Sequence, residues 1–413
     1  MEQFNKIIGY ENVKKELITI SDYFNKTDLC RQHNVKLPKG ILLYGDSGCG
    51  KTLFLKEFCK VTNKYVINVQ GCSDDIIKEI SDDFKEARVI GNTVIIIDEL
   101  DLLINKDYRI VRLLQSYLDG FEDYDGIFVV ATTNNVGKIE NSLLREGRFD
   151  RKIKVDLPNE KTRKELIDYY IRQLGLDVNV DSEYLSKIMV DRSCSFIQTI
   201  INDCYLRFNQ NITTDNIDYS YNVIAYGNTN DYIKNDINKT IAIHEAGHIA
   251  LTYKNRKYFT FYKASINTNS NKINGVSKLY DAKEQNDDLE EYIAKIEIDI
   301  AGFLTTYNLL KIKDGGSYGD LKDAIYNARF LINSLGYKMP RNVLREYDQF
   351  EGRNETEINC HRNEIFVRKL MKKCERNVKK YIIKNKKKIY DIANQLYERG
   401  SIKQNEVMEI MER

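Results

Sequence analysis

Two histidines one helical turn apart form the clearest metal-binding pattern in the chain. The segment 241–251 reads IAIHEAGHIAL, and its apolar spacing is helical, so His244 and His248 are expected on one helix face. Two imidazoles at this spacing can chelate one Zn²⁺, and Glu245 beside them can act as general base toward a water. HExxH patterns also arise by chance, and a lone histidine pair is more often structural. Here two of the four histidines fall within the pattern.

A catalytic zinc needs a third protein ligand and one open position. The other two histidines are His33, far upstream, and His361, in a charged region near the C-terminus. This scarcity favours a carboxylate, and the best candidate is Asp320, at the start of a helix expected over 321–335. An aspartate at a helix start more commonly acts as an N-cap. From the residues alone, both roles stay open.

A glycine-rich loop follows the first expected strand and opens an amphipathic helix. The loop consists of Gly45, Asp46, Ser47, Gly48, Cys49, Gly50, Lys51 and Thr52. Glycines let successive backbone N–H groups face phosphate oxygens, and the helix N-terminus adds positive potential. Lys51 is expected to reach the outer phosphates and the Thr52 hydroxyl to bind Mg²⁺. This pattern predicts an ATP site, since a chance glycine turn would not have this strand and helix around it.

Two further expected strands end in polar residues. Asp98 and Glu99 follow the run VIII at 94–97, and Asn134 follows ATT at 131–133. Carboxyl ends of parallel strands border the ligand crevice of an α/β sheet. Asp98 is therefore expected to hold Mg²⁺ through water, Glu99 to orient or deprotonate the attacking water, and Asn134 to lie beside them. Solvated acids at a strand end are the alternative.

Arg145 and Arg148 flank a tight turn in LLREGRFD, at 143–150. This place beyond the sheet edge suits the γ-phosphate of a neighbouring subunit better than that of their own. We therefore interpret them as arginine fingers supplied in trans. Surface salt bridges are the alternative for either residue alone.

Apolar runs alternating with amphipathic stretches indicate an α/β domain with a five-stranded parallel sheet. The strands are expected at 41–44, 65–69, 94–97, 127–131 and 153–155. Four short helices, at 159–174, 182–190, 195–209 and 214–226, are expected to form a helical lid. A polar stretch then leads into a mainly α-helical second domain, with a hairpin over 263–280 and an irregular loop over 337–359. The expected domains are 1–158 (nucleotide-binding), 159–226 (lid), 227–237 (linker) and 238–413 (zinc peptidase).

Composition excludes several classes of protein. The formal net charge of +2 gives no electrostatic reason to expect nucleic acid. No window reaches the roughly 18–20 apolar residues that a membrane span needs, so a soluble, cytoplasmic protein is expected. The eight cysteines form no CxxC pair and are expected as reduced thiols.

In combination, these motifs resemble the FtsH family of AAA+ ATP-dependent zinc proteases. The resemblance covers the glycine-rich loop, IIIDELD, ATTNN, LLREGRFDRKI, HEAGH and the pair Asp320-Leu321. It implies that Asp320 is the third zinc ligand and that ATP binds at subunit boundaries of a ring, usually a hexamer. It further implies that Asn274-Gly275-Val276 belongs to a strand that aligns the substrate.

The chain departs from the family in three ways. The N-terminal transmembrane region has no counterpart in the sequence. The interval 71–79, where the family carries an aromatic pore loop, is shorter and offers only Ile76 and Ile77. The segment 301–307, AGFLTTY, lacks the acidic residues that usually follow the paired small residues, so support of the zinc histidines is expected to differ.

We therefore expect an ATP-dependent zinc metalloendopeptidase that forms a homo-oligomeric ring and degrades protein or peptide substrates. The alternative is an AAA+ chaperone or remodelling ATPase whose peptidase half is weakly active or inactive. A third version cleaves only unstructured peptides, with ATP mainly organising the ring. The sequence does not define the substrates, their recognition signal, the ring size or the presence of an anchor.

Overall fold

The computed structural model describes residues 4–25, 32–33, 38–71, 75–120, 126–176, 178–226, 236–266, 276–279, 289–312, 317–337 and 357–413, with the backbone only at 25, 226, 276–279 and 357–362. The chain divides into two compact units, Met1–Ser220 and Tyr221–Arg413. None of the described helices is both long and apolar enough to cross a membrane.

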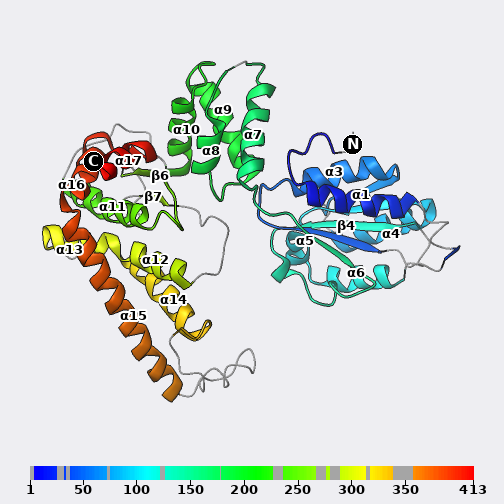
Figure 1. The fold of residues 1–413 in the computed structure, drawn as a ribbon. Helices are drawn as coiled ribbons and strands as arrows, with labels where there is room; N and C mark the ends of the chain where they lie inside the picture. Colours follow the sequence, from blue (N-terminus) through cyan, green and yellow to red (C-terminus); the bar gives the residue numbers. More distant parts are fainter. Residues whose placement is uncertain are drawn as a thin grey trace. The chain divides into compact units, whose positions relative to one another are not determined.

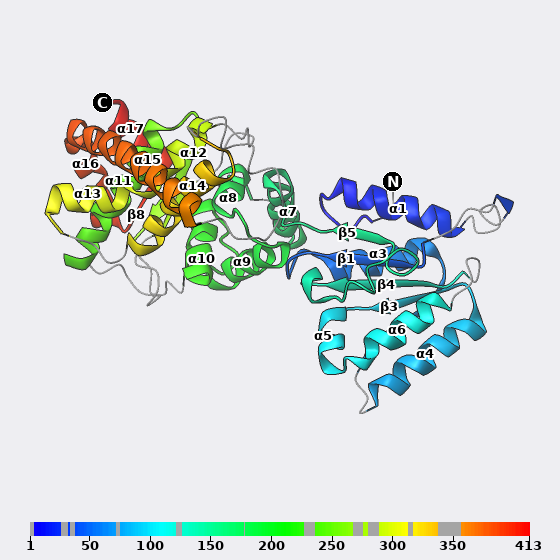
Figure 2. The ribbon, with the colours of Figure 1, turned by 90° about the horizontal axis from the view of Figure 1, so that it is seen from below.

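The first unit (Figure 1) is built on the expected five-stranded parallel sheet, with strand order β2-β3-β4-β1-β5. Figure 2 labels β3, β4, β1 and β5 side by side in this order. The strands are β1 (Gly40–Tyr44), β2 (Tyr65–Val69), β3 (Thr93–Ile97), β4 (Phe128–Thr133) and β5 (Arg151–Lys154). The central strands are buried on both faces, which explains their continuous apolar sequences. The edge strand β5 lies about two residues before its expected position.

Helices cover both faces of this sheet (Figure 2). On one face lie α4 (Ile76–Ile90), α5 (Leu100–Lys106) and α6 (Arg109–Asp119), and on the other lie α1 (Glu11–Asn25) and α3 (Lys51–Thr62). Side chains alternate along a strand, so Ile95 and Ile97 join the core of the first face while Val94 and Ile96 join that of the second. The sheet is thereby held rigidly between two apolar layers.

The four expected lid helices are present, each within two residues of its expected bounds. They are α7 (Glu160–Gln173), α8 (Ser182–Ile188), α9 (Cys194–Arg207) and α10 (Thr214–Tyr226). Asn159, Asp181 and Ser193 cap the first three, each accepting a hydrogen bond from a backbone N–H of the first turn. The expected linker 227–237 lies largely outside the described residues, and the domain boundaries stay predictions.

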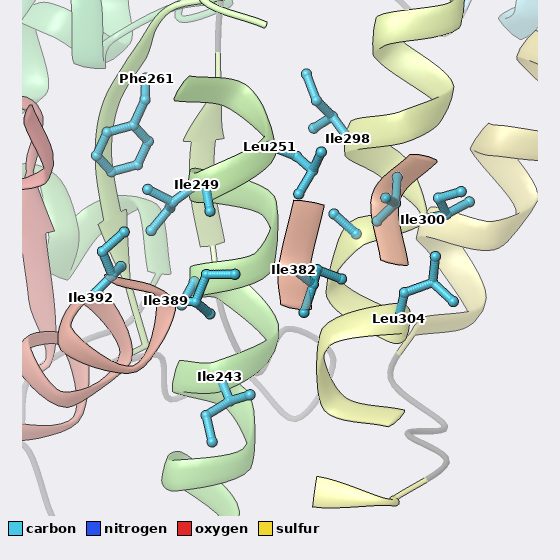
Figure 3. Packing of buried hydrophobic residues seen from close by; sticks show 14 of the residues in the cluster. Ile243, Ile249, Leu251, Phe261, Ile298, Ile300, Leu304, Ile382, Ile389 and Ile392 are labelled. Carbon is cyan, nitrogen blue, oxygen red and sulfur yellow. The ribbon is translucent and has the colours of Figure 1, made fainter. Parts of the chain in front are cut away.

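The second unit is mainly helical, as expected. Its elements are α11 (Asp236–Lys254), β6 (Phe261–Ser265), β7 (Val276–Leu279), α12 (Leu289–Asp299), α13 (Ala301–Leu310), α14 (Tyr318–Asn333), α15 (Glu357–Lys384), α16 (Lys386–Arg399), β8 (Ser401–Lys403) and α17 (Gln404–Glu412). The helix α11 is buried all round over 242–252. Figure 3 shows it between Ile298, Ile300 and Leu304 on one side and Ile389, Ile392 and Phe261 on the other.

A three-stranded antiparallel sheet completes the second unit, with order β7-β6-β8. The strands β6 and β7 confirm the expected hairpin over 263–280, whose turn lies outside the described residues. The third strand, β8, was not expected from the sequence. It is three residues long and stands between two helices, so it offers no alternation to recognise.

Two helix starts differ from the expectation. The helix α14 begins at Tyr318 rather than Leu321, so Asp320 lies inside its first turn and Ser317 occupies the N-cap position. The helix α15 begins at Glu357, and thus includes the end of the loop expected over 337–359. Asn385 separates α15 from α16.

Candidate metal centre and nucleotide site

The structure brings His244, His248 and Asp320 together. The Nε2 atom of His244 lies 3.0 Å from Nε2 of His248 and 3.1 Å from Oδ2 of Asp320, and Nε2 of His248 lies 3.3 Å from the same oxygen. These residues form the only cluster of potential metal-ligating side chains among the described residues. A carboxylate 76 residues away in sequence from His244 thus meets both histidines.

The two imidazoles are buried, and Asp320 is about one-third exposed. Both histidines lie on the fully buried part of α11, while Asp320 approaches from the first turn of α14. Partial exposure of Asp320 leaves one side of the cluster open to solvent, as a site that admits a substrate requires.

The outer nitrogen of His248 has a defined partner. Its Nδ1 atom lies 2.8 Å from the carbonyl oxygen of Ile298, at the end of α12. A carbonyl oxygen can only accept, so Nδ1 carries the proton and Nε2 turns its lone pair toward the cluster. No sequence pattern indicates this contact, because a backbone carbonyl has no residue-type signature.

The outer nitrogen of His244 lies 3.5 Å from the hydroxyl of Ser317, which is fully buried at the N-cap position of α14. Ser317 was not among the expected site residues. Its position three residues before Asp320 could have indicated it, because both side chains start from the same turn.

Asp320 is held as a carboxylate. Burial alone would raise its pKa, but hydrogen bonds and charge interactions with His244 and His248 outweigh burial and hold the pKa well below its usual range. The N-cap role left open by the sequence does not apply, since Ser317 holds that position.

Gly302 gives the cluster the space it needs. A Cβ atom at Gly302 would lie 2.4 Å from Nε2 of His244 and 2.5 Å from Nε2 of His248, closer than side-chain atoms can approach. The missing side chain therefore leaves room between α13 and the two ring nitrogens. The paired small residues Ala301-Gly302 were noted in the sequence, but their packing against the histidines was not foreseen.

The donor set fits Zn²⁺. Atoms held about 2.0–2.1 Å from a tetrahedral ion lie about 3.3 Å apart, close to the 3.0–3.3 Å separations among the two Nε2 atoms and Oδ2. Two imidazoles and one carboxylate would then hold the ion and leave its fourth position free. Glu245 follows His244 on α11 and is buried.

The two remaining histidines and the segment 301–307 can be located only in part. His33 is exposed in the first unit, and His361 lies in α15 with its side chain outside the described residues. Within 301–307, the polar residues Thr305 and Thr306 are both fully buried. One acid, Asp299, directly follows Ile298 at the end of α12. Its carboxylate accepts a hydrogen bond from Asn327 at 3.0 Å and pairs with Lys295.

In the first unit, the glycine-rich loop joins β1 to α3. Gly48 and Gly50 have φ angles of +78° and +93°, in the left-handed region that glycine tolerates. A Cβ at Gly48 would meet Ser195 and Ser193 at the start of the lid helix α9, and the Ser195 N–H donates to the Gly48 carbonyl at 3.1 Å. Loop and lid are therefore in direct contact.

Lys51 and Thr52 of the loop each have defined polar partners. The Lys51 ammonium is buried and donates to the carbonyls of Gly45 and Asp46 at 2.8 and 2.7 Å. Its burial lowers its pKa, against the opposing charges of nearby acids. The Thr52 hydroxyl lies 2.9 Å from an Asp98 oxygen, which brings together two of the oxygen ligands that Mg²⁺ prefers.

Thr132, at the end of β4, organises the acidic end of β3 and was not foreseen. Its hydroxyl donates to Asp98 and accepts from the backbone N–H of Glu99 at 2.9 Å. Glu99 has φ +53°, a left-handed conformation that is costly for a residue other than glycine and is concentrated at functional sites. Asn134 follows β4 and is half-buried at the same carboxyl edge.

The two arginines differ in their surroundings. Arg148 forms two hydrogen bonds with the Asp119 carboxylate, at 2.9 and 2.8 Å, and these bonds lower the pKa of Asp119. Arg145 is exposed and has no ion-pair partner within the described part of the chain. The salt-bridge alternative thus fits Arg148, whereas Arg145 is available to another molecule.

Of the expected pore-loop interval, Ile76 and Ile77 begin α4, and 72–74 lie outside the described residues.

Together, the two sites define a chain in which a P-loop ATPase unit is followed by a helical unit carrying a histidine–carboxylate metal cluster. Residues 41–157 match the ATPase family associated with various cellular activities (AAA), and residues 231–410 match peptidase family M41. The chain therefore carries an AAA domain and an M41 peptidase domain, as the resemblance implied.

Relatives that align over most of the chain support this assignment. The chain is 26% identical over 369 residues to the ATP-dependent zinc metalloprotease YME1L1 of Mus musculus, covering 84% of this chain and 52% of that protein. It is 26% identical over 431 residues to the ATP-dependent zinc metalloprotease FtsH 2 of Thermoanaerobacter sp. (strain X514), covering 99% and 82%. The chain spans about half the length of the mouse, human and rat YME1L1 proteins.

Proposed function

We propose that the protein is an ATP-dependent zinc metalloendopeptidase that degrades protein or peptide substrates. The observation that carries the proposal is the convergence of His244, His248 and Asp320, in a chain that also holds a complete P-loop site. Relatives named ATP-dependent zinc metalloproteases match across both domains. A cytoplasmic location stays a prediction from the sequence.

Each residue of the metal cluster has a role that follows from its contacts. His244, His248 and Asp320 would hold Zn²⁺, and the Ile298 carbonyl and the Ser317 hydroxyl would keep the two rings in orientation. Bound zinc supplies a Lewis acid that acidifies a water and polarises the scissile carbonyl. Glu245 would accept the proton from the attacking water and pass it to the leaving amine.

Hydrolysis of ATP at the first site would supply the free energy that drives substrate degradation. Lys51 would neutralise the outer phosphates, Thr52 and Asp98 would hold Mg²⁺, and Glu99 would orient the attacking water. We place the ATP site at the boundary between subunits of a homo-oligomeric ring, because Arg145 is exposed and has no ion-pair partner among the described residues. The family resemblance adds a hexamer as the expected ring size. Light scattering with and without ATP measures the assembly.

The decisive experiment compares Glu245→Gln with Glu409→Gln, a control at an exposed position of α17. We expect Glu245→Gln to lower casein cleavage at least about 100-fold, the scale of lost general-base catalysis. Zinc content and ATP turnover should stay at the level of the unchanged protein. Cleavage at the normal rate by a folded, zinc-loaded Glu245→Gln protein would refute the peptidase assignment.

Coupling is tested separately with Lys51→Ala. This variant should lose ATP turnover and the degradation of folded substrates, while its zinc content stays unchanged. Comparison of an unstructured peptide with a tightly folded tagged domain then separates threading from simple peptidase action. If folded domains are never cleaved by the unchanged protein with ATP, ATP serves ring assembly rather than threading.

A further inference from the structure

A cavity lies in the second unit, at the C-terminal end of α11, and its lining includes none of the residues of the metal cluster. It has a volume of about 340 Å³ and is lined by the last turn of α11, the segment 256–260 that follows it, the start of β6 and the first turns of α17. This size is near the lower end of small-molecule sites.

The walls of this cavity are mainly apolar. Phe261 and Val407 are buried at its base, Phe259 is half-buried, and Met408 is 42% exposed at the rim. Burying an apolar group against these side chains would stabilise a complex by removing hydrocarbon surface from water. An apolar body of modest size is therefore the first requirement for a ligand.

One cation lines the cavity, and no acid does. The Arg256 guanidinium is exposed, donates once to the Tyr253 carbonyl at 3.2 Å and lies over the Tyr253 ring. Throughout the described residues it has no carboxylate partner. Arginine presents five donors in a planar fork that suits a carboxylate, so most of its binding capacity remains open.

Two uncharged polar groups complete the lining. The side chains of Gln404 and Thr260 make no hydrogen bond to any described residue, although both line the cavity. A few polar groups with open valences on an otherwise apolar wall are typical of sites that orient a small ligand. The second requirement is thus a compact anionic head that can accept several hydrogen bonds.

We propose that this cavity binds a small apolar carboxylate, with the carboxylate on Arg256 and the hydrocarbon against Phe261, Val407 and Met408. Two sources share this chemistry: a free medium-chain carboxylic acid, and the C-terminal residue of a peptide with an apolar side chain. The proposal goes beyond the peptidase function, and binding can be measured without any cleavage.

The test uses the full chain and calorimetric titration with octanoate, octanamide, acetyl-Ala-Ala-Leu and the C-terminal amide of that peptide. We expect a carboxylate to bind at least about fivefold more tightly than its amide. Tighter binding of octanoate would identify a free acid as the source, and tighter binding of the peptide would identify a peptide C-terminus. Equal affinity for acid and amide, or no binding of either acid at millimolar concentration, would overturn the proposal.

Variants locate the ligand. Arg256→Gln should weaken carboxylate binding at least fivefold and remove the preference over the amide, while Lys257→Gln, the adjacent exposed cation outside the lining, should change neither. Met408→Ser should weaken the acid and the amide equally, since it removes only apolar contact. Circular dichroism checks folding. Unchanged binding in both Arg256→Gln and Met408→Ser would place the ligand elsewhere.

Discussion

Gly302 lies so close to His244 that no side-chain carbon fits between them: a Cβ at position 302 would be 2.4 Å from the His244 Nε2 atom. The positions of the His244 and His248 ring nitrogens on α11 therefore depend on the absence of a side chain at position 302 on α13. This relationship makes a glycine part of the metal site, although glycine provides no ligand atom.

We predict that Gly302→Ala lowers zinc content, because the new methyl group would push the two imidazoles out of their shared geometry. Metal analysis of the purified protein measures the effect, and we expect at least a tenfold weaker zinc affinity. Gly319→Ala is the matched control, since a Cβ there meets no atom within 4 Å. Equal zinc binding by both variants would contradict the spatial role of Gly302.

Asp320→Asn should also lower zinc affinity, since the amide lacks the charge and the second acceptor oxygen that a metal ligand needs. Loss of about 10- to 100-fold or more is expected from the removal of a ligand. Competition with a chromophoric chelator measures it. Asp323→Asn, one turn further along α14 and exposed, is the control and should bind zinc normally.

Retention of zinc in Asp320→Asn, together with loss in His361→Ala, would show that the third ligand comes from α15 instead. Both variants belong in the same titration, because His361 is the only other histidine of the second unit.

Gly247 reports on packing between α11 and α13. A Cβ at this position would lie 2.4 Å from the Thr305 hydroxyl oxygen and 2.8 Å from the Ala301 carbonyl. Gly247→Ala should therefore lower the free energy of unfolding of the second unit by about 1–3 kcal/mol, the usual cost of overpacking. Urea unfolding measures it, with Gly319→Ala again as control. An unchanged midpoint would mean that the two helices can separate without cost.

Arg145 and Arg148 should respond differently to substitution. Arg145→Ala is expected to leave the unfolding midpoint unchanged and to lower ATP turnover of the assembled protein at least about 1000-fold, as for a lost arginine finger. Arg148→Ala should also remove the ion pair with Asp119. The resulting loss in the free energy of unfolding should stay below about 1 kcal/mol, because the Asp119 carboxylate is mostly solvated. Arg112→Ala, on an exposed position of α6, is the control.

Normal turnover by an assembled Arg145→Ala protein would exclude Arg145 as a finger. Mixing Arg145→Ala with Lys51→Ala subunits then shows whether the arginine acts on a neighbour. Partial recovery of turnover in the mixed ring is the expected result, since some boundaries would pair an intact Lys51 with an intact Arg145.

Local patterns were sufficient for much of the molecule. The phosphate loop, the apolar strands and the four lid helices depend on residues adjacent in sequence, so composition and periodicity predicted them. The pair His244 and His248 is equally local, because helical geometry alone brings positions i and i+4 to one face.

Contacts between distant segments were beyond those patterns. Whether Asp320 caps a helix or meets the histidines depends on where packing against α12 and α15 places the start of α14, and Ser317 takes the cap position there. The Ile298 carbonyl, the space at Gly302 and the short strand β8 likewise exist only once the helices have assembled. Side-chain type and spacing determined which chemistry the chain can perform, and tertiary packing decided which carboxylate takes part, because distance in space is independent of distance in sequence.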